Sequence, residues 1–339
     1  MKKKVLLTGV SGYIGNHCAA ELLKKGYYVR GSLRDMSKSE SVIAAVKKEV
    51  DPKNSLDFCE LDLLNDKGWD DAVLDCDYVM HVASPFINLE PKDSNIFIKP
   101  AVEGTKRALE AARKAGVKRV VLTSSIVSML GNANKSMYVN ARTWTNVNAK
   151  NVSAYAKSKT LAEQYAWNFI KNQNNQNSME LVVINPGPVF GPSLSENLEG
   201  TSMRLFKQML TGEMPMIPQA GMNMSDVRDI AKIQVLALEN KEASGNRYLV
   251  TTQKAYQFQE ISQILKLNGY EKVSTKLAPN FLLNFMGNFN SEVKSMRAFI
   301  GKTYTGDITP AMTTFNWKPI NFKKTLLDTA KSITDILKK

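Results

Sequence analysis

A short apolar run followed at once by three evenly spaced glycines constrains this chain more than any other feature of its sequence. Val5–Leu7 is apolar, as expected for a strand buried on both faces, and Gly9, Gly12 and Gly15 follow it. Beyond Gly15, apolar residues recur at helical spacing until Gly26, where a helix would stop. The stretch therefore predicts a strand, a glycine loop and a helix.

Glycines in such a loop allow a dinucleotide pyrophosphate to approach the backbone, because no Cβ is in the way. The phosphate charge then lies against free N–H groups at a helix N-terminus. The spacing G-x-x-G-x-x-G departs by one residue from the G-x-G-x-x-G fingerprint of dinucleotide-binding loops. By itself the loop fits either a nucleotide site or an ordinary turn between strand and helix.

The length and composition narrow the class of protein. A chain of 339 residues with 43% apolar residues predicts about two domains of a soluble globular protein. Three scattered cysteines and two distant histidines predict reduced thiols, no metal site and a cytoplasmic location. No apolar run reaches the roughly 18 residues that a membrane span needs.

The net charge of +13 raises the question of nucleic-acid binding. The lysines are scattered, and no basic stripe interleaved with aromatic residues is found. We therefore expect no nucleic-acid or membrane partner, and a basic surface that favours a phosphorylated cofactor.

The end of the second predicted strand, Tyr28–Leu33, indicates which dinucleotide would bind. In a nucleotide fold an Asp or Glu at this point holds the ribose hydroxyls of NAD, but here Arg34 follows the strand. An arginine suits a 2′-phosphate through bidentate contact, so NADP(H) is favoured, with Lys38 as a second phosphate ligand. The alternative is an ordinary exposed arginine, because Asp35 comes next.

Strands and helices alternate along the first half of the chain, which predicts an α/β protein with a parallel sheet. Asp62 follows the third strand and could either hydrogen-bond an adenine amino group or cap the next helix. A surface loop is expected at Asn172–Asn177 and a terminal helix at Lys323–Lys339. The further strands are expected at Leu56–Leu61, Tyr78–Ala83 (ended by Ser84-Pro85), Arg119–Thr123 and Leu181–Ile184, and helices at Ser39–Val50, Ile98–Ala115 and from Tyr155 to Ile170.

Tyr155 and Lys159 form the pair that points most directly to chemistry. Their i, i+4 spacing places both side chains on one face of the predicted helix. A phenol titrates at about pH 10 and exchanges protons poorly at neutral pH unless a cation stabilises its phenolate. The spacing is weak evidence alone, but it follows the glycine loop, a second strand without a terminal acid, and the strand-terminal Ser124-Ser125, in that order.

Further motifs extend over nearly the whole chain. They are Thr8–Gly15 (T-G-V-S-G-Y-I-G), Val29-Arg30 with Arg34-Asp35, His81–Pro85 (H-V-A-S-P), Thr123–Ser125, Tyr155–Glu163 (Y-A-K-S-K-T-L-A-E), Asn185–Pro192 (N-P-G-P-V-F-G-P), Asp226–Asp229 (D-V-R-D) and Phe315–Pro319 (F-N-W-K-P). With these motifs the chain resembles the extended short-chain dehydrogenase/reductases, and more narrowly their dihydroflavonol 4-reductase-like branch.

The resemblance implies a Rossmann-type, doubly wound parallel sheet with a smaller, interleaved substrate domain towards the C-terminus. Residues 1–185, with returns near 226–250, would bind NADP(H). Residues 186–225 and 251–339 would mainly form the substrate domain.

The resemblance also implies roles for individual residues. Tyr155 would be the catalytic acid, and Lys159 would lower its pKa and hold the nicotinamide ribose. Ser125, or failing it Ser124, would hydrogen-bond the substrate carbonyl. The cofactor would be bound by Gly9, Gly12, Tyr13, Ile14 and Gly15 at the pyrophosphate, Arg34 and Lys38 at the 2′-phosphate, Asp62 and Leu63 at the adenine, Val82, Ala83 and Ser84 at the nicotinamide side, and Pro186 and Val189 beside the nicotinamide amide.

The sequence departs from the plant members of the branch where the substrate would lie. Ile126–Ser128 replaces smaller residues, and Asn132–Asn151 is rich in asparagine without the usual acids, which argues against a flavonoid substrate. The cysteine-containing signature of cinnamoyl-CoA reductases is also missing. Two apolar groups are open to interpretation: Met203, Phe206, Met209, Met214 and Met216 as core or pocket lining, and Leu282, Leu283, Phe285, Met286 and Phe289 as a lid or a subunit contact.

These observations predict an NADPH-dependent carbonyl reductase, acting on a small-molecule aldehyde or ketone as a monomer or homodimer. The alternatives are an NAD-dependent nucleotide-sugar epimerase or dehydratase, or a 3β-hydroxysteroid dehydrogenase-like enzyme. A non-catalytic NADP-sensing regulator is a third, against which the Tyr155–Lys159 pair argues.

Overall fold

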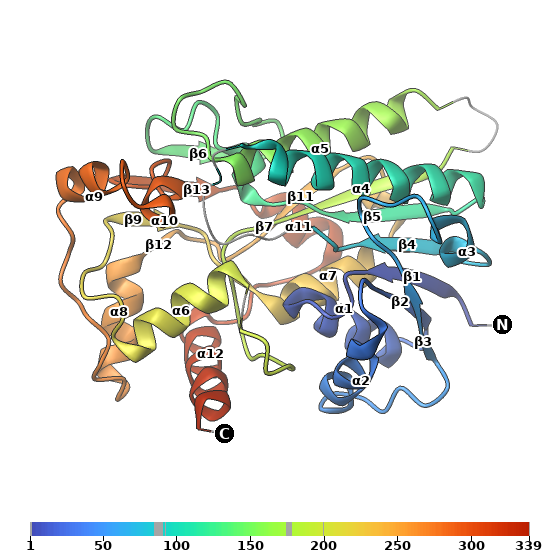
Figure 1. Ribbon diagram of the computed structural model, residues 1–339, viewed down its shortest axis with the longest axis horizontal. Coiled ribbons are helices and arrows are strands. Elements are labelled where there is room, and N and C mark those ends of the chain that lie inside the picture. Colours follow the sequence, from blue (N-terminus) through green and yellow to red (C-terminus); the bar gives the residue numbers. More distant parts are fainter. Residues whose placement is uncertain (1, 85–90, 92, 174–177, 199, 339) are drawn as a thin grey trace.

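A parallel sheet forms the centre of the molecule (Figure 1). The computed structural model describes residues 2–84, 91, 93–173, 178–198 and 200–338. Among these residues, seven parallel strands pair in the order β11-β7-β5-β4-β1-β2-β3. They are β1 (Lys4–Thr8), β2 (Tyr28–Leu33), β3 (Leu56–Glu60), β4 (Tyr78–His81), β5 (Arg119–Thr123), β7 (Glu180–Pro186) and β11 (Arg247–Val250). The predicted Rossmann-type, doubly wound sheet is confirmed.

Helices cover both faces of this sheet, as Figure 1 shows. Successive side chains of a strand point to opposite faces, so each apolar strand supplies two cores. Leu6 packs in one core with α3 (Trp69–Val73) and α4 (Asn95–Lys114), whereas Val5 and Leu7 pack in the other. The elements around the sheet are α1 (Tyr13–Lys24), α2 (Ser39–Lys47), α5 (Ala154–Lys171) and α7 (Val227–Ala237), with short 3-10 helices at Met36–Lys38, Ile126–Met129 and Lys241–Ala243.

Two small sheets and most of the remaining helices occupy the other end of the molecule, whereas α11 (Thr309–Phe315) packs against β11 and α7 (Figure 1). One sheet pairs β8 (Val189–Phe190) with β10 (Ser225–Asp226), and the other has the order β12-β9-β13-β6. Its strands are β6 (Met137–Val139), β9 (Ala220–Met222), β12 (Tyr256–Gln257) and β13 (Lys302–Gly306), and the helices are α6 (Thr201–Thr211), α8 (Phe258–Leu267), α9 (Asn280–Met286), α10 (Ser291–Ser295), α11 (Thr309–Phe315) and α12 (Phe322–Leu337). After α6 the chain returns to the large sheet through α7 and β11. We propose the two-domain division given above on this basis.

Several predicted boundaries differ from the observed ones for local reasons. The fourth strand ends at His81 rather than Ala83, because the Thr8 hydroxyl accepts the N–H groups of Val82 and Ala83. The helix expected from Ile98 begins at Asn95, with Pro100 inside it. The expected features at Pro85, at 174–177 of the Asn-rich loop and at Lys339 lie outside the described residues.

The two apolar groups differ in burial. Met203, Phe206 and Met209 are buried in the core, Met214 packs partly buried against it, and Met216 is exposed. On α9 and just beyond it, Phe285 and Phe289 are mostly exposed, so the lid or subunit contact stays a prediction. No helix in the described part of the chain is long and apolar enough to cross a membrane.

Candidate active site

The tight fold of the glycine loop explains why two of its positions require glycine. Gly9 has φ +71°, and a Cβ there would lie 2.8 Å from the backbone of Ala83. A Cβ on Gly15 would lie 2.1 Å from the carbonyl oxygen of Gly9, which also accepts the N–H of Gly12 at 3.0 Å. Side chains at Gly9 and Gly15 would therefore force the loop away from β4 and α1.

The N-terminus of α1 is suited to an anion. Gly12 is its N-cap and supplies no capping side chain, and the first turn holds no acidic residue. The N–H groups of Tyr13, Ile14 and Gly15 belong to the first turn of the helix, whose amides have no intrahelical acceptor. The exposed Gly12 leaves the approach to this turn free of a side chain, so the residues present fit a pyrophosphate.

Thr8 connects the glycine loop to the end of β4. Its hydroxyl oxygen accepts the N–H groups of Val82 and Ala83, both at 3.1 Å, and lies 2.9 Å from Nδ1 of His81. Because both lone pairs of the hydroxyl are used, it donates its hydrogen to Nδ1, and the proton of neutral His81 lies on Nε2. Burial, with a smaller effect of the Lys159 charge, lowers the pKa of His81 to about 3, so the ring is neutral at physiological pH. Val82, Ala83 and Ser84 follow as partly buried backbone at the sheet edge.

Arg34 and Lys38 both lie exposed beyond the end of β2. The carboxylate of Asp35 is occupied elsewhere, since it accepts hydrogen bonds from the backbone and hydroxyl of Ser37 at 3.0 and 2.6 Å. Within the described residues no ion pair holds the Arg34 guanidinium. Arg34 and Lys38 thus present two exposed cations where a 2′-phosphate is expected, with the charge of Lys38 also acting on Asp35.

Asp62 lies exposed at the end of β3, with Leu63 half-buried beside it. The Asp62 carboxylate accepts the N–H of Leu64 at 2.7 Å and so closes a local turn. It does not cap the next helix, whose N-cap is Gly68. Of the two predicted roles, the capping of the helix is wrong, and the adenine contact stays a prediction.

Tyr155, Ser125 and Lys159 converge at the carboxyl end of β5. Burial raises the pKa of Tyr155, and a hydrogen bond with the Ser125 side chain partly opposes that effect. The role of Lys159 in lowering the pKa of Tyr155 stays a prediction. Burial lowers the pKa of Lys159 to about 8, against the charge of Glu163, and its Nζ donates to the Thr123 carbonyl at 3.3 Å. Phe97 packs edge-on against the Tyr155 ring, with centroids 6.4 Å apart.

The two neighbouring serines have different partners. Ser124 donates its hydroxyl to the buried carboxylate of Glu163 at 2.5 Å. Ser125 instead has a long 3.5 Å contact with the Pro186 carbonyl and accepts the N–H of Val127 at 3.3 Å. Its hydroxyl is therefore the more available of the two for a substrate oxygen.

Pro186 and Val189 are buried at the point where the chain leaves the sheet. The next turn is fixed by α1, because Tyr13 donates its hydroxyl to the Gly191 carbonyl at 2.8 Å.

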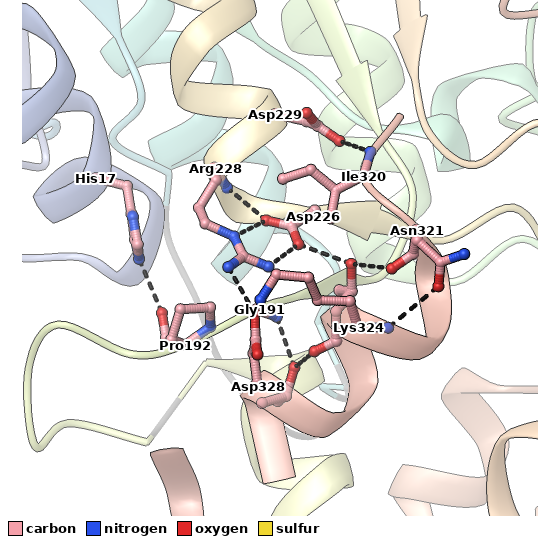
Figure 2. Close-up of polar contacts among 12 residues, drawn as sticks. His17, Gly191, Pro192, Asp226, Arg228, Asp229, Ile320, Asn321, Lys324 and Asp328 are labelled. Carbon is pink, nitrogen blue, oxygen red and sulfur yellow. Dashed lines mark hydrogen bonds and ion pairs between the residues drawn. The ribbon is translucent and has the colours of Figure 1, made fainter. Parts of the chain in front are cut away.

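Figure 2 shows the contacts beside this turn, in which Arg228 joins the β10–α7 junction to α12. Arg228 lies between Asp226 and Asp328, at 2.6 Å from each carboxylate. His17 of α1 contacts the Pro192 carbonyl at 2.8 Å. The glycine-loop helix, the exit from the sheet and the C-terminal helix thus form one connected unit.

The structure brings Ser125, Tyr155 and Lys159 together, with the glycine loop and Val82–Ser84 at the same edge of the sheet. The sequence analysis assigned no role to Thr8 or Glu163, although both lie in its motifs, and it did not identify Arg247; all three support these residues. Glu163 continues the spacing of Tyr155 and Lys159 by one more helical turn, so it could have been found. The described residues contain no group of three or more His, Cys, Asp or Glu side chains that could hold a metal ion.

A Rossmann-type sheet with a glycine loop and a Ser-Tyr-Lys cluster at one edge defines the class of dinucleotide-dependent enzymes. Residues 5–251 match the model of the NAD dependent epimerase/dehydratase family, and the chain belongs to that family. The predicted extended short-chain dehydrogenase/reductase, dihydroflavonol 4-reductase-like membership is confirmed.

Curated relatives and solved structures agree with this assignment. Cinnamoyl-CoA reductase CAD2 of Medicago truncatula is 34% identical over 77% of this chain and 79% of its own. The NADPH-dependent methylglyoxal reductase GRE2 of Saccharomyces cerevisiae is 31% identical over 77% and 81%. The structure of yeast methylglyoxal/isovaleraldehyde reductase Gre2 complexed with NADPH matches with a TM-score of 0.78, 26% identity and 99% coverage of both chains.

Proposed function

We propose that this protein is an NADPH-dependent carbonyl reductase whose chemistry is carried by Ser125, Tyr155 and Lys159. The observation that carries the proposal is the convergence of these three side chains at the sheet edge next to the glycine loop. The relatives support an oxidoreductase that uses NADP(H), since yeast GRE2 is an NADPH-dependent reductase and its structure is an NADPH complex.

The residues present fit this cofactor. The free first turn of α1 would hold the pyrophosphate through the amides of Tyr13, Ile14 and Gly15. The exposed Arg34, with Lys38, would pair with the 2′-phosphate, which NAD(H) lacks. Asp62 and Leu63 would border the adenine, and Val82–Ser84, Pro186 and Val189 the nicotinamide.

NADPH, when bound, would supply the hydride that reduces the carbonyl carbon. Ser125 would orient the carbonyl oxygen through its hydroxyl, and Tyr155 would donate its proton to the same oxygen as negative charge develops there. The raised pKa of Tyr155 keeps the phenol protonated at neutral pH, which is the form that reduction needs. The Lys159 ammonium would favour the phenolate left behind and would bind the nicotinamide ribose.

The proposed substrate class is a small aldehyde or ketone. Curated relatives act on cinnamoyl-CoA, tetraketide α-pyrones and methylglyoxal, so the shared reaction is carbonyl reduction and the substrate varies. Sugar-nucleotide epimerases with NAD, such as that of Bacillus cereus, match at 21% identity, which shows a common fold alone.

The experiment is a panel of aldehydes, diketones, 2-oxoaldehydes and flavanonols, with NADPH and with NADH, followed by loss of reduced-nicotinamide absorbance. Tyr155→Phe should lower kcat about 10²- to 10⁴-fold and leave NADPH affinity nearly unchanged. Full turnover in that variant would contradict the mechanism, and activity with NADH alone would contradict the role of Arg34.

A further inference from the structure

Glu163 is a buried carboxylate one helical turn beyond Lys159. Tyr155, Lys159 and Glu163 follow one another at four-residue spacing on α5, so they share one face of the helix. The Glu163 side chain has no exposed surface. A carboxylate in such a place is stable only if it is paired and hydrogen-bonded.

The partners of Glu163 come from several elements around the active site. Its Oε2 accepts hydrogen bonds from Ser124 at 2.5 Å, Ser128 at 2.8 Å and Asn185 at 3.0 Å. Its Oε1 lies 2.6 Å from Nε of Arg247 in an ion pair. One carboxylate therefore ties the end of β5, the following 3-10 helix, β7 and β11 to α5.

Arg247 balances the negative charge of Glu163, and no contact between Arg247 and Lys159 is found among the described residues. Its guanidinium donates to Glu163 Oε2 at 3.0 Å, to Ser128 at 2.8 Å and to the Thr143 carbonyl at 3.0 Å, and it stacks over the Trp144 ring at 3.8 Å. These contacts hold the Arg247 guanidinium against the Glu163 carboxylate.

Among the described residues, Glu163 is the acidic side chain that lies beside Lys159. A small internal cavity beside Lys159 is lined by Glu163, Ser124, the neutral His81 and uncharged residues of α4 such as Thr105. Tyr155 on the same helix is protonated, and the Thr123 carbonyl accepts one Nζ hydrogen. Among the described groups, Glu163 is the one whose charge opposes the effect of burial on Lys159.

We propose that Glu163 is a positioning residue that keeps the ammonium of Lys159 charged in its buried site and fixes the end of β5 beside it. The inference rests on the proposed function, in which charged Lys159 binds the nicotinamide ribose and assists Tyr155. It adds Glu163 to the Tyr155–Lys159 pair as a third, supporting residue on the same face of α5.

The test is the pH dependence of NADPH affinity, measured by the fluorescence of bound NADPH with the full-length protein. In the wild type, affinity should fall about tenfold as Lys159 loses its charge, with a midpoint near pH 8. In Glu163→Gln the same loss should occur with its midpoint at distinctly lower pH. A midpoint equal to that of the wild type would overturn the inference.

Two controls separate charge from packing. Ser124→Ala removes one hydrogen bond to the carboxylate but keeps its charge, so it should retain the wild-type midpoint; a shift as large as that of Glu163→Gln would overturn the inference. Lys159→Met should abolish the transition, and a transition that persists there would show that another group causes it and would equally overturn the inference.

A folding defect is a foreseeable outcome of Glu163→Gln, because Arg247 would keep a buried charge without its partner. Glu163→Gln/Arg247→Met removes both charges, and it should show the same acid shift. NADPH binding at no pH in the wild type would refute the proposed function itself, whereas binding with an unshifted midpoint in both variants would refute the role of Glu163 alone.

Discussion

Replacement of Arg34 by alanine should weaken NADPH binding and leave NADH binding unchanged. Arg34 is exposed and forms no ion pair within the described residues, while Asp35 is bonded to Ser37. The substitution therefore breaks no ion pair among the described residues, and the change in NADPH affinity reports the loss of the contact between Arg34 and the 2′-phosphate.

The expected magnitude follows from that exposure. A hydrogen bond to a charged group contributes about 1.5–3 kcal/mol, and each 1.4 kcal/mol is about tenfold in affinity. Because water and salt screen an exposed pair, the lower part of this range applies, which is about 10- to 30-fold in Kd.

Fluorescence titration with both cofactors measures the effect. Lys47→Ala is the matched control, since it removes a nearby exposed cation on α2 and should change either Kd by less than about twofold. An unchanged NADPH affinity in Arg34→Ala, or an equal loss for NADH, would refute the assignment of the 2′-phosphate to this residue.

Three further perturbations test other parts of the structure. Ser125→Ala should lower kcat about 10²- to 10³-fold with little change in Tm, whereas Ser124→Ala should keep kcat within a fewfold and lower Tm; the reverse pattern would exchange their roles. Gly15→Ala should abolish NADPH binding by fluorescence because its Cβ meets the Gly9 carbonyl, whereas Gly200→Ala, in open space, should bind normally; normal binding in both would contradict the tight loop. Partial burial acts to raise the pKa of Asp328, but hydrogen bonds from Lys324 and Arg228 hold that pKa below its usual value. The ionised carboxylate therefore stabilises the fold above about pH 4, and this stabilisation is lost as the pH falls further. Asp328→Asn should therefore lower Tm by one or two degrees, as a rough estimate, at pH 7 and match the wild type near pH 3; a constant difference at both pH values would argue against the ion pair.

Much of the large parallel sheet could be predicted because the sequence signals of its strands are local. Buried parallel strands are short apolar runs, and Arg119–Thr123 was predicted with both observed ends. The glycine loop and the Tyr155–Lys159 pair each span only a few residues, so both motifs can be recognised in the sequence. The predicted end of β4 was wrong because it depends on Thr8, more than 70 residues away.

The second part of the molecule was predicted less well, since its strands are short and pair across long separations. β6 pairs with β13, and neither has a repeated apolar pattern long enough to identify it. The ion pair of Glu163 with Arg247 joins positions 84 residues apart, and nothing local in the sequence relates them. The greater availability of Ser125 also depends on a distant contact, because Ser124 is engaged by Glu163, 39 residues further along the chain.

The position of β11 at the edge of the large sheet has a consequence for how the protein is made. β11, the strand that carries Arg247, pairs with β7 but leaves the ribosome long after it. A fragment ending at residue 185 would hold Glu163 without its cation and β7 without its outer neighbour. We therefore expect that residues 1–185 do not fold as an independent unit, and that during synthesis the large sheet remains open until the intervening segment has emerged.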